Sequence, residues 1–213
     1  MSKGEVVLLN SFESNSHTMT AQIFFASFQM EPSFSNLRAV IYTDIEEFTR
    51  FRYLVVNSVM ATDVMDREIG ASRKARWLQA FDTQGSKGDN SVVAEAINDR
   101  KATIVIEHLI QASDVAHTMQ HWHMFTKWNG RLFQECYQAY LSGRAEADPS
   151  IGWYEGELGF FDFYVIPLAK KLKESGVFGV SSDEYLNYAT QNRKEWEEKG
   201  KDIVAGYTKK YKK

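Results

Sequence analysis

Residues 116–142 read AHTMQHWHMFTKWNGRLFQECYQAYLS and decide the fold. Large apolar side chains recur in this stretch at steps of three and four residues, namely Trp122, Phe125, Trp128, Leu132 and Cys136. This spacing places them along one face of an α-helix. Gly143 and Pro149 follow, and glycine and proline commonly end helices. The stretch therefore predicts one long helix with a single apolar face.

Similar spacing predicts helices on both sides of this stretch. They cover residues 44–67, 71–82, 91–98, 101–113, 153–173 and 182–199, and a further helix is expected within residues 1–36. Asp44 and Ser182 are suitable N-caps. Pro167 should bend the helix that contains it, because proline has no backbone N–H. No alternation typical of a strand extends beyond a few residues, so the predicted fold class is all-α.

Composition and charge exclude several classes of protein. The 213 residues include 14 Phe, 10 Tyr and 5 Trp but only 3 Pro, which favours a helical globular core. With 25 Lys+Arg against 28 Asp+Glu the net charge is -3, which argues against a nucleic-acid partner. No apolar run approaches the roughly 20 residues of a membrane span, and no secretory signal is recognisable. A single cysteine, Cys136, indicates a reducing compartment, and we expect a cytoplasmic location.

One group of side chains has spacing suited to metal binding. Asp114, His117 and His121 stand at positions i, i+3 and i+7, and a continuous helix would place them on one face. A carboxylate and two imidazoles so arranged can bind a divalent metal ion. The alternative is that Asp114 caps the long helix and both histidines lie at the surface or the edge of the core. Spacing alone leaves both interpretations open.

Several short motifs occur in a fixed order along the chain. They are Ala61-Thr62-Asp63, Ser113-Asp114, the helix containing Trp128, and the segment 158–168 with Gly159-Phe160-Phe161-Asp162. This set resembles the later part of the catalytic domain of class I 3',5'-cyclic nucleotide phosphodiesterases, from about residue 36 to 173. The sequence as a whole is most similar to phosphodiesterase domains that follow nucleotide cyclase domains in some unicellular eukaryotes. The resemblance implies an HD-like helical domain that hydrolyses a cyclic nucleotide to its 5'-monophosphate in signal transduction, with two divalent metal ions, Zn and Mg or Mn.

The resemblance also implies roles for individual residues. Asp114 matches a late metal ligand, and Phe160 and Leu132 match the two apolar residues that sandwich the purine. His117 and Asn129 match base-pocket positions where the family usually has Asn and Thr. The remaining pocket-lining positions are Asp63 and Val64 in the turn beside the metals, and Phe125 and Trp128 on the pocket wall. For Phe125 and Trp128 a plain core role fits equally well.

Glu157 departs from the family pattern, because it stands where the family has a glutamine whose amide pairs with the purine. An ionised carboxylate only accepts hydrogen bonds. It can take the two donors on the pairing edge of guanine, whereas adenine offers one donor beside an acceptor. Since a bidentate base contact discriminates by about 1 to 3 kcal/mol, the departure predicts a preference for cyclic GMP over cyclic AMP. The alternative is that Glu157 faces solvent or a basic neighbour.

Two motifs of the resembled family have no counterpart here. The His-Asn-x-x-His segment and the His-Asp pair supply the general acid and three of the four protein metal ligands, and His17 cannot replace them. We therefore expect that the N-terminal helices of the fold are missing, that the metal ions are incompletely bound, and that no catalytic residue can be assigned. Hydrolysis by this chain alone should be weak or absent.

The predicted organisation has three parts: an atypical N-terminal segment, 1–35, the C-terminal part of a phosphodiesterase domain, 36–200, and a basic tail, 201–213. Helices that lack their covering partners should expose an apolar face and self-associate. The expected ligand is a cyclic nucleotide, and the parent protein is expected to be fused to a cyclase, or to be a larger membrane receptor with this domain in the cytoplasm. Two alternatives are a non-catalytic remnant that binds a nucleotide or a partner, and an unrelated helical interaction protein.

Overall fold

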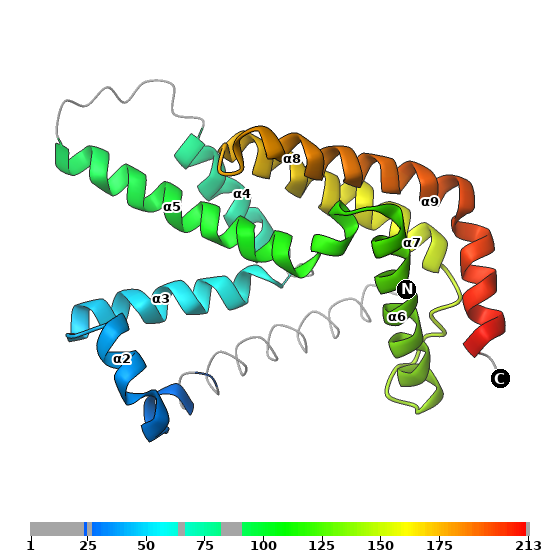
Figure 1. Ribbon diagram of the computed structural model, residues 1–213, viewed down its shortest axis with the longest axis horizontal. Coiled ribbons are helices and arrows are strands. Elements are labelled where there is room, and N and C mark those ends of the chain that lie inside the picture. Colours follow the sequence, from blue (N-terminus) through cyan, green and yellow to red (C-terminus); the bar gives the residue numbers. More distant parts are fainter. Residues whose placement is uncertain (1–23, 25–26, 64–66, 82–90, 212–213) are drawn as a thin grey trace. The chain divides into compact units, whose positions relative to one another are not determined.

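The computed structural model describes residue 24 and residues 27–63, 67–81 and 91–211 (Figure 1). The chain divides into two compact units, Met1–Gln111 and Ala112–Lys213. The elements of the described residues are all helical, so the predicted all-α class is confirmed. Most of the helix expected within residues 1–36 lies outside the described part. No helix among the described residues combines the length and apolarity that a membrane span requires.

The described residues of the first unit include helical residues 27–30, a short 3-10 turn and four further α-helices. The turn and the four helices are η1 (Pro32–Phe34), α2 (Ser35–Ile41), α3 (Ile45–Ala61), α4 (Arg67–Phe81) and α5 (Ser91–Asp114), of which the last three residues belong to the second unit. Asp44 caps α3 as predicted, because its Oδ1 accepts hydrogen bonds from the backbone N–H groups of Glu46 and Glu47, both at 2.9 Å. Two helices were expected where α5 is one, and that prediction is wrong. No glycine or proline interrupts residues 91–114, and Ile104 packs in the core halfway along.

The described residues of the second unit, beyond the end of α5, form four α-helices and three short turns. They are η2 (Ala116–Met119), α6 (Trp122–Leu141), α7 (Trp153–Phe160), the π-helical turn η3 (Phe161–Val165), α8 (Ile166–Ser175), η4 (Gly179–Ser181) and α9 (Ser182–Tyr211). α8 and α9 lie side by side (Figure 1). After α6 the chain turns at Gly143, whose φ of 72° is a left-handed conformation that glycine adopts without strain.

The long helix predicted over residues 116–142 is interrupted before Trp122. Gln120 is extended, with φ -125° and ψ -177°, and His121 is the N-cap of α6. The cause lies in α9, where buried Asn192 donates hydrogen bonds to the carbonyl oxygens of Thr118 at 2.9 Å and Gln120 at 2.7 Å. These carbonyls are satisfied by a side chain instead of by the next helical turn, and the chain changes direction.

The last helix extends well beyond residue 199, where it was expected to end. Its inner face continues through Trp196, Val204 and Tyr207, which contact or bury against the rest of the second unit. Gly200 lies on the same face, and a Cβ there would come within 2.8 Å of the Trp196 ring and 2.9 Å of the Tyr154 ring. Part of the segment expected to be a basic tail is therefore a packed helix.

The bend expected at Pro167 takes another form. The backbone N–H of Ile166 donates to the carbonyl oxygen of Phe161, five residues earlier, so the chain forms the π-helical turn η3 immediately before the proline. Pro167 then stands in the first turn of α8, where its missing N–H costs no helical hydrogen bond. The 153–173 segment thus consists of two α-helices joined by a wider turn.

Candidate nucleotide-binding site

The candidate site is built on α6 and the segment formed by α7 and η3. Three side-chain contacts join them: Phe125 with Phe161, Asn129 with Glu157, and Phe133 with Trp153. From one contact to the next, the residue number rises by four on α6 and falls by four on the other segment. The two therefore run antiparallel in a fixed register.

The outer two contacts of this register are aromatic. The Phe125 and Phe161 ring centroids lie 5.2 Å apart at an interplanar angle of 69°, and those of Phe133 and Trp153 lie 5.1 Å apart at 84°. Such edge-to-face pairs are favourable and directional. Phe125 is 0% exposed and also meets Trp196 of α9. It lies in the core, which is one of the two roles that the sequence allowed for it.

The middle contact is polar. Asn129 Nδ2 donates to Glu157 Oε2 at 3.0 Å, and the Trp153 indole N–H donates to Asn129 Oδ1 at 3.2 Å. Asn129 is only 2% exposed, and Glu157 is partly buried. Burial raises the pKa of the Glu157 carboxyl to about 7, although the hydrogen bond from Asn129 acts in the opposite direction. Glu157 thus contacts an amide instead of the basic neighbour that the sequence left as an alternative.

Tyr207 of α9 contacts α6 on either side of Asn129, at Thr126 and at Phe133. Its hydroxyl donates to the carbonyl oxygen of Thr126 at 3.0 Å. Burial raises the pKa of the Tyr207 phenol to about 12, with smaller contributions from Tyr211 and Glu157. The phenol is therefore neutral near pH 7. It adds no charge near the Glu157 carboxyl.

The two residues expected to sandwich a purine lie on either side of the Asn129–Glu157 pair. Leu132 and Phe160 each follow a member of that pair by three residues, about 4.5 Å of helix rise, and the helices run in opposite directions. Leu132 is 48% exposed, while Phe160 is partly buried and stacks on Tyr164 with ring centroids 5.3 Å apart. An apolar side chain thus stands one turn from the polar pair in each direction.

Two further residues expected near the base have mixed surroundings. Trp128 is exposed on α6, and the Arg131 guanidinium lies over its ring, 4.7 Å from the centroid. His117 lies in η2 and is half-buried. Burial lowers the pKa of the His117 imidazole, and the carboxylate of Asp114 offsets part of that effect. His117 is therefore neutral at pH 7.

The metal-binding face predicted for Asp114, His117 and His121 is not formed by one helix. Asp114 is the exposed last residue of α5, and His117 lies in the separate turn η2. His121 caps α6, and its Nε2 lies 3.1 Å from the Tyr188 hydroxyl. In the described ranges no three His, Cys, Asp or Glu side chains gather as metal ligands. The residues present do not by themselves fit a two-metal centre.

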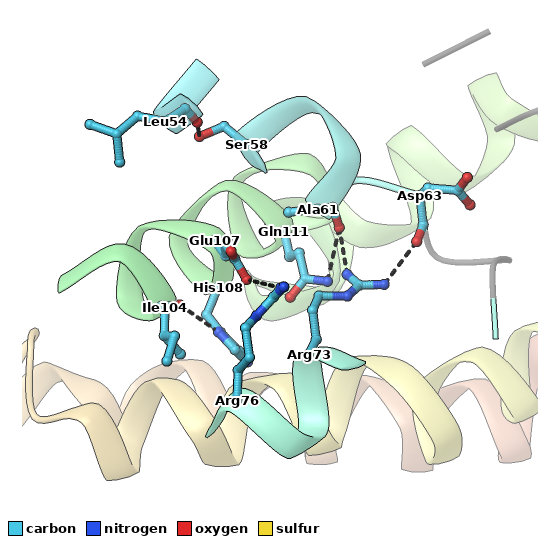
Figure 2. A network of polar contacts seen from close by, with 10 residues as sticks. All are labelled: Leu54, Ser58, Ala61, Asp63, Arg73, Arg76, Ile104, Glu107, His108 and Gln111. Atoms are coloured by element: carbon cyan, nitrogen blue, oxygen red, sulfur yellow. Dashed lines mark hydrogen bonds and ion pairs between the residues drawn. The ribbon is translucent and has the colours of Figure 1, made fainter. Parts of the chain in front are cut away.

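Asp63 lies in the first unit, just beyond α3, and is 1% exposed. Figure 2 shows the polar network around it: Arg73 donates to the carbonyl oxygens of Ala61 at 2.6 Å and Asp63 at 2.9 Å, and Gln111 donates to that of Ala61 at 2.9 Å. The Asp63 carboxyl group points away from Arg73 (Figure 2). Val64, the other predicted residue of this turn, lies outside the described residues.

Trp153 and Tyr207 are the residues of this site that the sequence did not single out. Trp153 precedes Glu157 by four residues, so the two share a helix face. Tyr207 continues the inner face of α9 beyond Trp196 and Val204. Both signals were present, but their meaning depends on the pairing of helices distant in sequence.

The chain belongs to the 3'5'-cyclic nucleotide phosphodiesterase family, since the sequence model of that family matches residues 8–176. The fold is similar to the crystal structure of the phosphodiesterase domain of the RhoPDE fusion protein from the choanoflagellate Salpingoeca rosetta. The TM-score is 0.62 at 20% identity, over 96% of this chain and 61% of that one.

A second crystal structure, of the phosphodiesterase domain of Salpingoeca rosetta rhodopsin phosphodiesterase, gives a TM-score of 0.62 at 19% identity. The match covers 98% of this chain and 60% of that one. The chain thus spans about three fifths of both solved domains. Comparison with curated proteins finds no match.

Proposed function

We propose that this chain forms the base-binding wall of a 3',5'-cyclic nucleotide phosphodiesterase, whose reaction yields a nucleoside 5'-monophosphate. The observation that carries the proposal is the Asn129–Glu157 hydrogen bond, flanked one turn away by Leu132 and Phe160. A polar pair can read the hydrogen-bonding edge of a purine, while apolar side chains cover its faces. Family membership supports the assignment of the ligand as a cyclic nucleotide.

The proposal includes a preference for cyclic GMP. An ionised Glu157 offers acceptors to the two donors on the pairing edge of guanine. Adenine N1 is also an acceptor, so its contact with an ionised Glu157 would be unfavourable. Trp153 supports this role, because it fixes the Asn129 amide that contacts the carboxyl.

Divalent metal ions, Zn with Mg or Mn, are part of the proposal through the family, whose members are generally metal-dependent. Asp114 would be a ligand, and His117 would line the base pocket beside it. Trp128 would line the wider pocket. Asp63 lies in the first unit and Val64 lies outside the described residues, so their pocket roles remain predictions from the family resemblance. No catalytic step is assigned to residues of this chain.

Asp114 is exposed, and among the described residues no further ligands gather with it into a metal site. This favours a second candidate function, a module that binds a nucleotide or a protein partner without hydrolysing it. Turnover separates the two. If cyclic AMP or cyclic GMP binds but is not hydrolysed with Mg²⁺, Mn²⁺ or Zn²⁺ present, the chain is a binding module. Hydrolysis at an enzymatic rate would identify a complete enzyme.

The proposal also covers location and assembly. A cytoplasmic domain of a larger signalling protein, fused to a cyclase or to a membrane receptor, is compatible with the single cysteine and with helices too short or too polar to span a membrane within the described residues. Self-association through exposed apolar side chains such as Trp128, Leu132 and Ile151 is part of the same proposal. Sedimentation velocity over a range of protein concentrations tests it.

Calorimetric titration of the 213-residue chain with cyclic GMP and cyclic AMP tests the central proposal. Leu132→Ala and Phe160→Ala should each weaken binding by about tenfold or more, since each removes about 1.5 kcal/mol or more of apolar contact. Phe163→Ala is the matched control, because Phe163 is 87% exposed and one turn from Phe160. Equal affinity of all variants would contradict the proposal.

A further inference from the structure

The Asn129 amide has a fixed orientation between two partners. Its Oδ1 accepts from the Trp153 indole N–H at 3.2 Å, and an indole can only donate. Its Nδ2 consequently faces Glu157 and donates to Oε2 at 3.0 Å. Turning the amide over would oppose two donors at Trp153, so Asn129 donates to the carboxyl in either protonation state.

This fixed orientation of the Asn129 amide, called the amide lock below, makes the two oxygens of Glu157 different. Oε2 is occupied as the acceptor of the Asn129 N–H, and it retains one lone pair. Oε1 has no hydrogen-bond partner within the part of the chain that the structure describes. The Asn129 N–H stabilises negative charge on Oε2, so a proton bound by the carboxyl is favoured on Oε1.

Among the described residues, no charged group contributes to the shift in the pKa of the Glu157 carboxyl. Asn129 donates to it from α6, and Trp153 precedes it on α7. The phenol of Tyr207 on α9, whose pKa the carboxylate helps to raise, is neutral. Burial raises the pKa of Glu157 to about 7. Both protonation states are therefore populated under physiological conditions.

We propose that the proton on Glu157 Oε1 determines which purine the site accepts. This inference rests on the proposed function. In the ionised state both oxygens accept, which matches the N1–H and exocyclic amino donors of guanine. In the protonated state Oε1–H donates while Oε2 accepts, as a glutamine amide would, which matches adenine N1 and its amino group and also guanine O6 and N1–H. The site therefore prefers guanine when ionised and accepts both bases when protonated.

The test is calorimetric titration of the 213-residue chain with cyclic AMP and cyclic GMP at constant ionic strength, from about pH 6 to about pH 8. The protonated fraction of a group that titrates near 7 falls about tenfold over this range, so the association constant for cyclic AMP should fall about tenfold. That for cyclic GMP should change less than about threefold, because both states offer guanine a matched pair. A ratio of affinities that does not vary with pH would overturn the inference.

Glu157→Gln is the matched control, because it keeps a donor and an acceptor but cannot titrate. Its ratio of affinities should stay constant over the same range. Any dependence that remains belongs to other groups, including His117. A wild-type ratio that varies no more than that of Glu157→Gln contradicts the inference.

Trp153→Phe tests the orienting role of the indole N–H and keeps an aromatic ring against Phe133. Without the amide lock, the Asn129 amide can turn and accept from a protonated Glu157, which stabilises the protonated state. The midpoint of the cyclic AMP dependence should therefore move to higher pH. Trp122→Phe, which removes an indole on the same helix as Asn129, should leave the midpoint unchanged. An unchanged midpoint in Trp153→Phe would remove Trp153 from the proposal.

A measurement without nucleotide separates protonation of Glu157 from nucleotide binding. The infrared C=O band of a protonated carboxylic acid, in the difference between wild type and Glu157→Gln, should be present at pH 6 and absent at pH 8.5. Its absence at pH 6 overturns the inference. If the band titrates but neither nucleotide binds a folded chain at any pH, the proposed function fails, and the purine preference fails with it.

Discussion

The two units of the protein bury polar groups of different kinds. Around the end of α3, the first unit encloses the guanidinium of Arg73 and the carboxylate of Glu107, which pairs with Arg76 at 2.9 Å. The buried polar side chains described in the second unit are neutral, and Asn129 and Asn192 are examples. Charge in an interior must be paired and hydrogen-bonded, whereas neutral amides need only satisfied hydrogen bonds.

The apolar cores differ in a complementary way. In the first unit Trp77, Ala80 and Ile104 form a small buried cluster with Phe81 against it. In the second unit the aromatic rings of α6, η3 and α9 interlock around Phe125. The first unit should therefore depend on its polar network for local order, and the second on ring packing. Hydrogen exchange read by mass spectrometry can follow each unit separately, which makes the comparison testable.

The largest effect should come from Phe125→Ala. The ring is fully buried between Phe161 and Trp196, so its removal leaves a cavity that should cost about 3 to 5 kcal/mol of unfolding free energy. Exchange should accelerate throughout the second unit and not in the first. The control is Phe163→Ala at a solvent-exposed ring, which should change stability by less than about 0.5 kcal/mol. A small loss in Phe125→Ala would mean that the ring lines an open pocket.

Arg73→Ala should have the next largest effect, and in the first unit. The guanidinium donates to two backbone carbonyls that end α3, and charge-assisted bonds of this kind contribute enough that the loss should be about 2 to 4 kcal/mol. Gln111 still donates to the Ala61 carbonyl oxygen, so part of the polar network at the end of α3 remains. Local exchange near residues 57–63 should rise, while Lys74→Ala, an exposed cation on the same helix, should leave it unchanged. Equal exchange in both variants would show that the polar network is dispensable.

Features of the fold could be predicted from the sequence where the interacting residues are close together in the chain. The start of α3 was predictable, because Asp44 bonds to backbone groups two and three residues away. The apolar face of α6 was predictable from its own spacing. The interruption before α6 was not, because it is imposed by Asn192, more than 70 residues later in the chain.

The same distinction applies to the site. Asn129 and Glu157 were each expected near the base, but their hydrogen bond requires the antiparallel register of α6 and α7, which no local pattern contains. Trp153 gains its role only through that register. The end of α9 was missed for another reason, since Tyr207 and Tyr211 continue its inner face within a lysine-rich segment that resembles a solvated tail.

Glu157→Gln compares the partly buried carboxyl of the second unit with that of the first. Because burial raises the pKa of Glu157, the folded chain binds an extra proton between pH 4.5 and about 7. Stability from this group is present at low pH and is lost as pH rises toward 7. The variant avoids that loss, so it should be more stable than wild type by about 1 to 3 kcal/mol at pH 8 and equal to it near pH 4.

Glu107→Gln provides the contrast at pH 8. It breaks the ion pair with Arg76 and should destabilise the first unit by about 1 to 3 kcal/mol. Chemical denaturation at both pH values measures the two variants. The distinction between the units would be lost if both substitutions shifted stability in the same direction at pH 8.

The smallest effect should come from Asp162→Asn, which tests a guanidinium pair at the surface against the buried Arg73. Arg193 contacts Asp162 through two bonds, at 2.9 and 3.1 Å, and this lowers the pKa of the Asp162 carboxyl. The contribution is present at neutral pH and is lost as pH falls through the lowered pKa. Because both side chains are solvated, the substitution should cost less than about 1 kcal/mol, and 1 M NaCl should reduce that cost further. A loss as large as that of Arg73→Ala, insensitive to salt, would mean that burial is not what separates the two arginines.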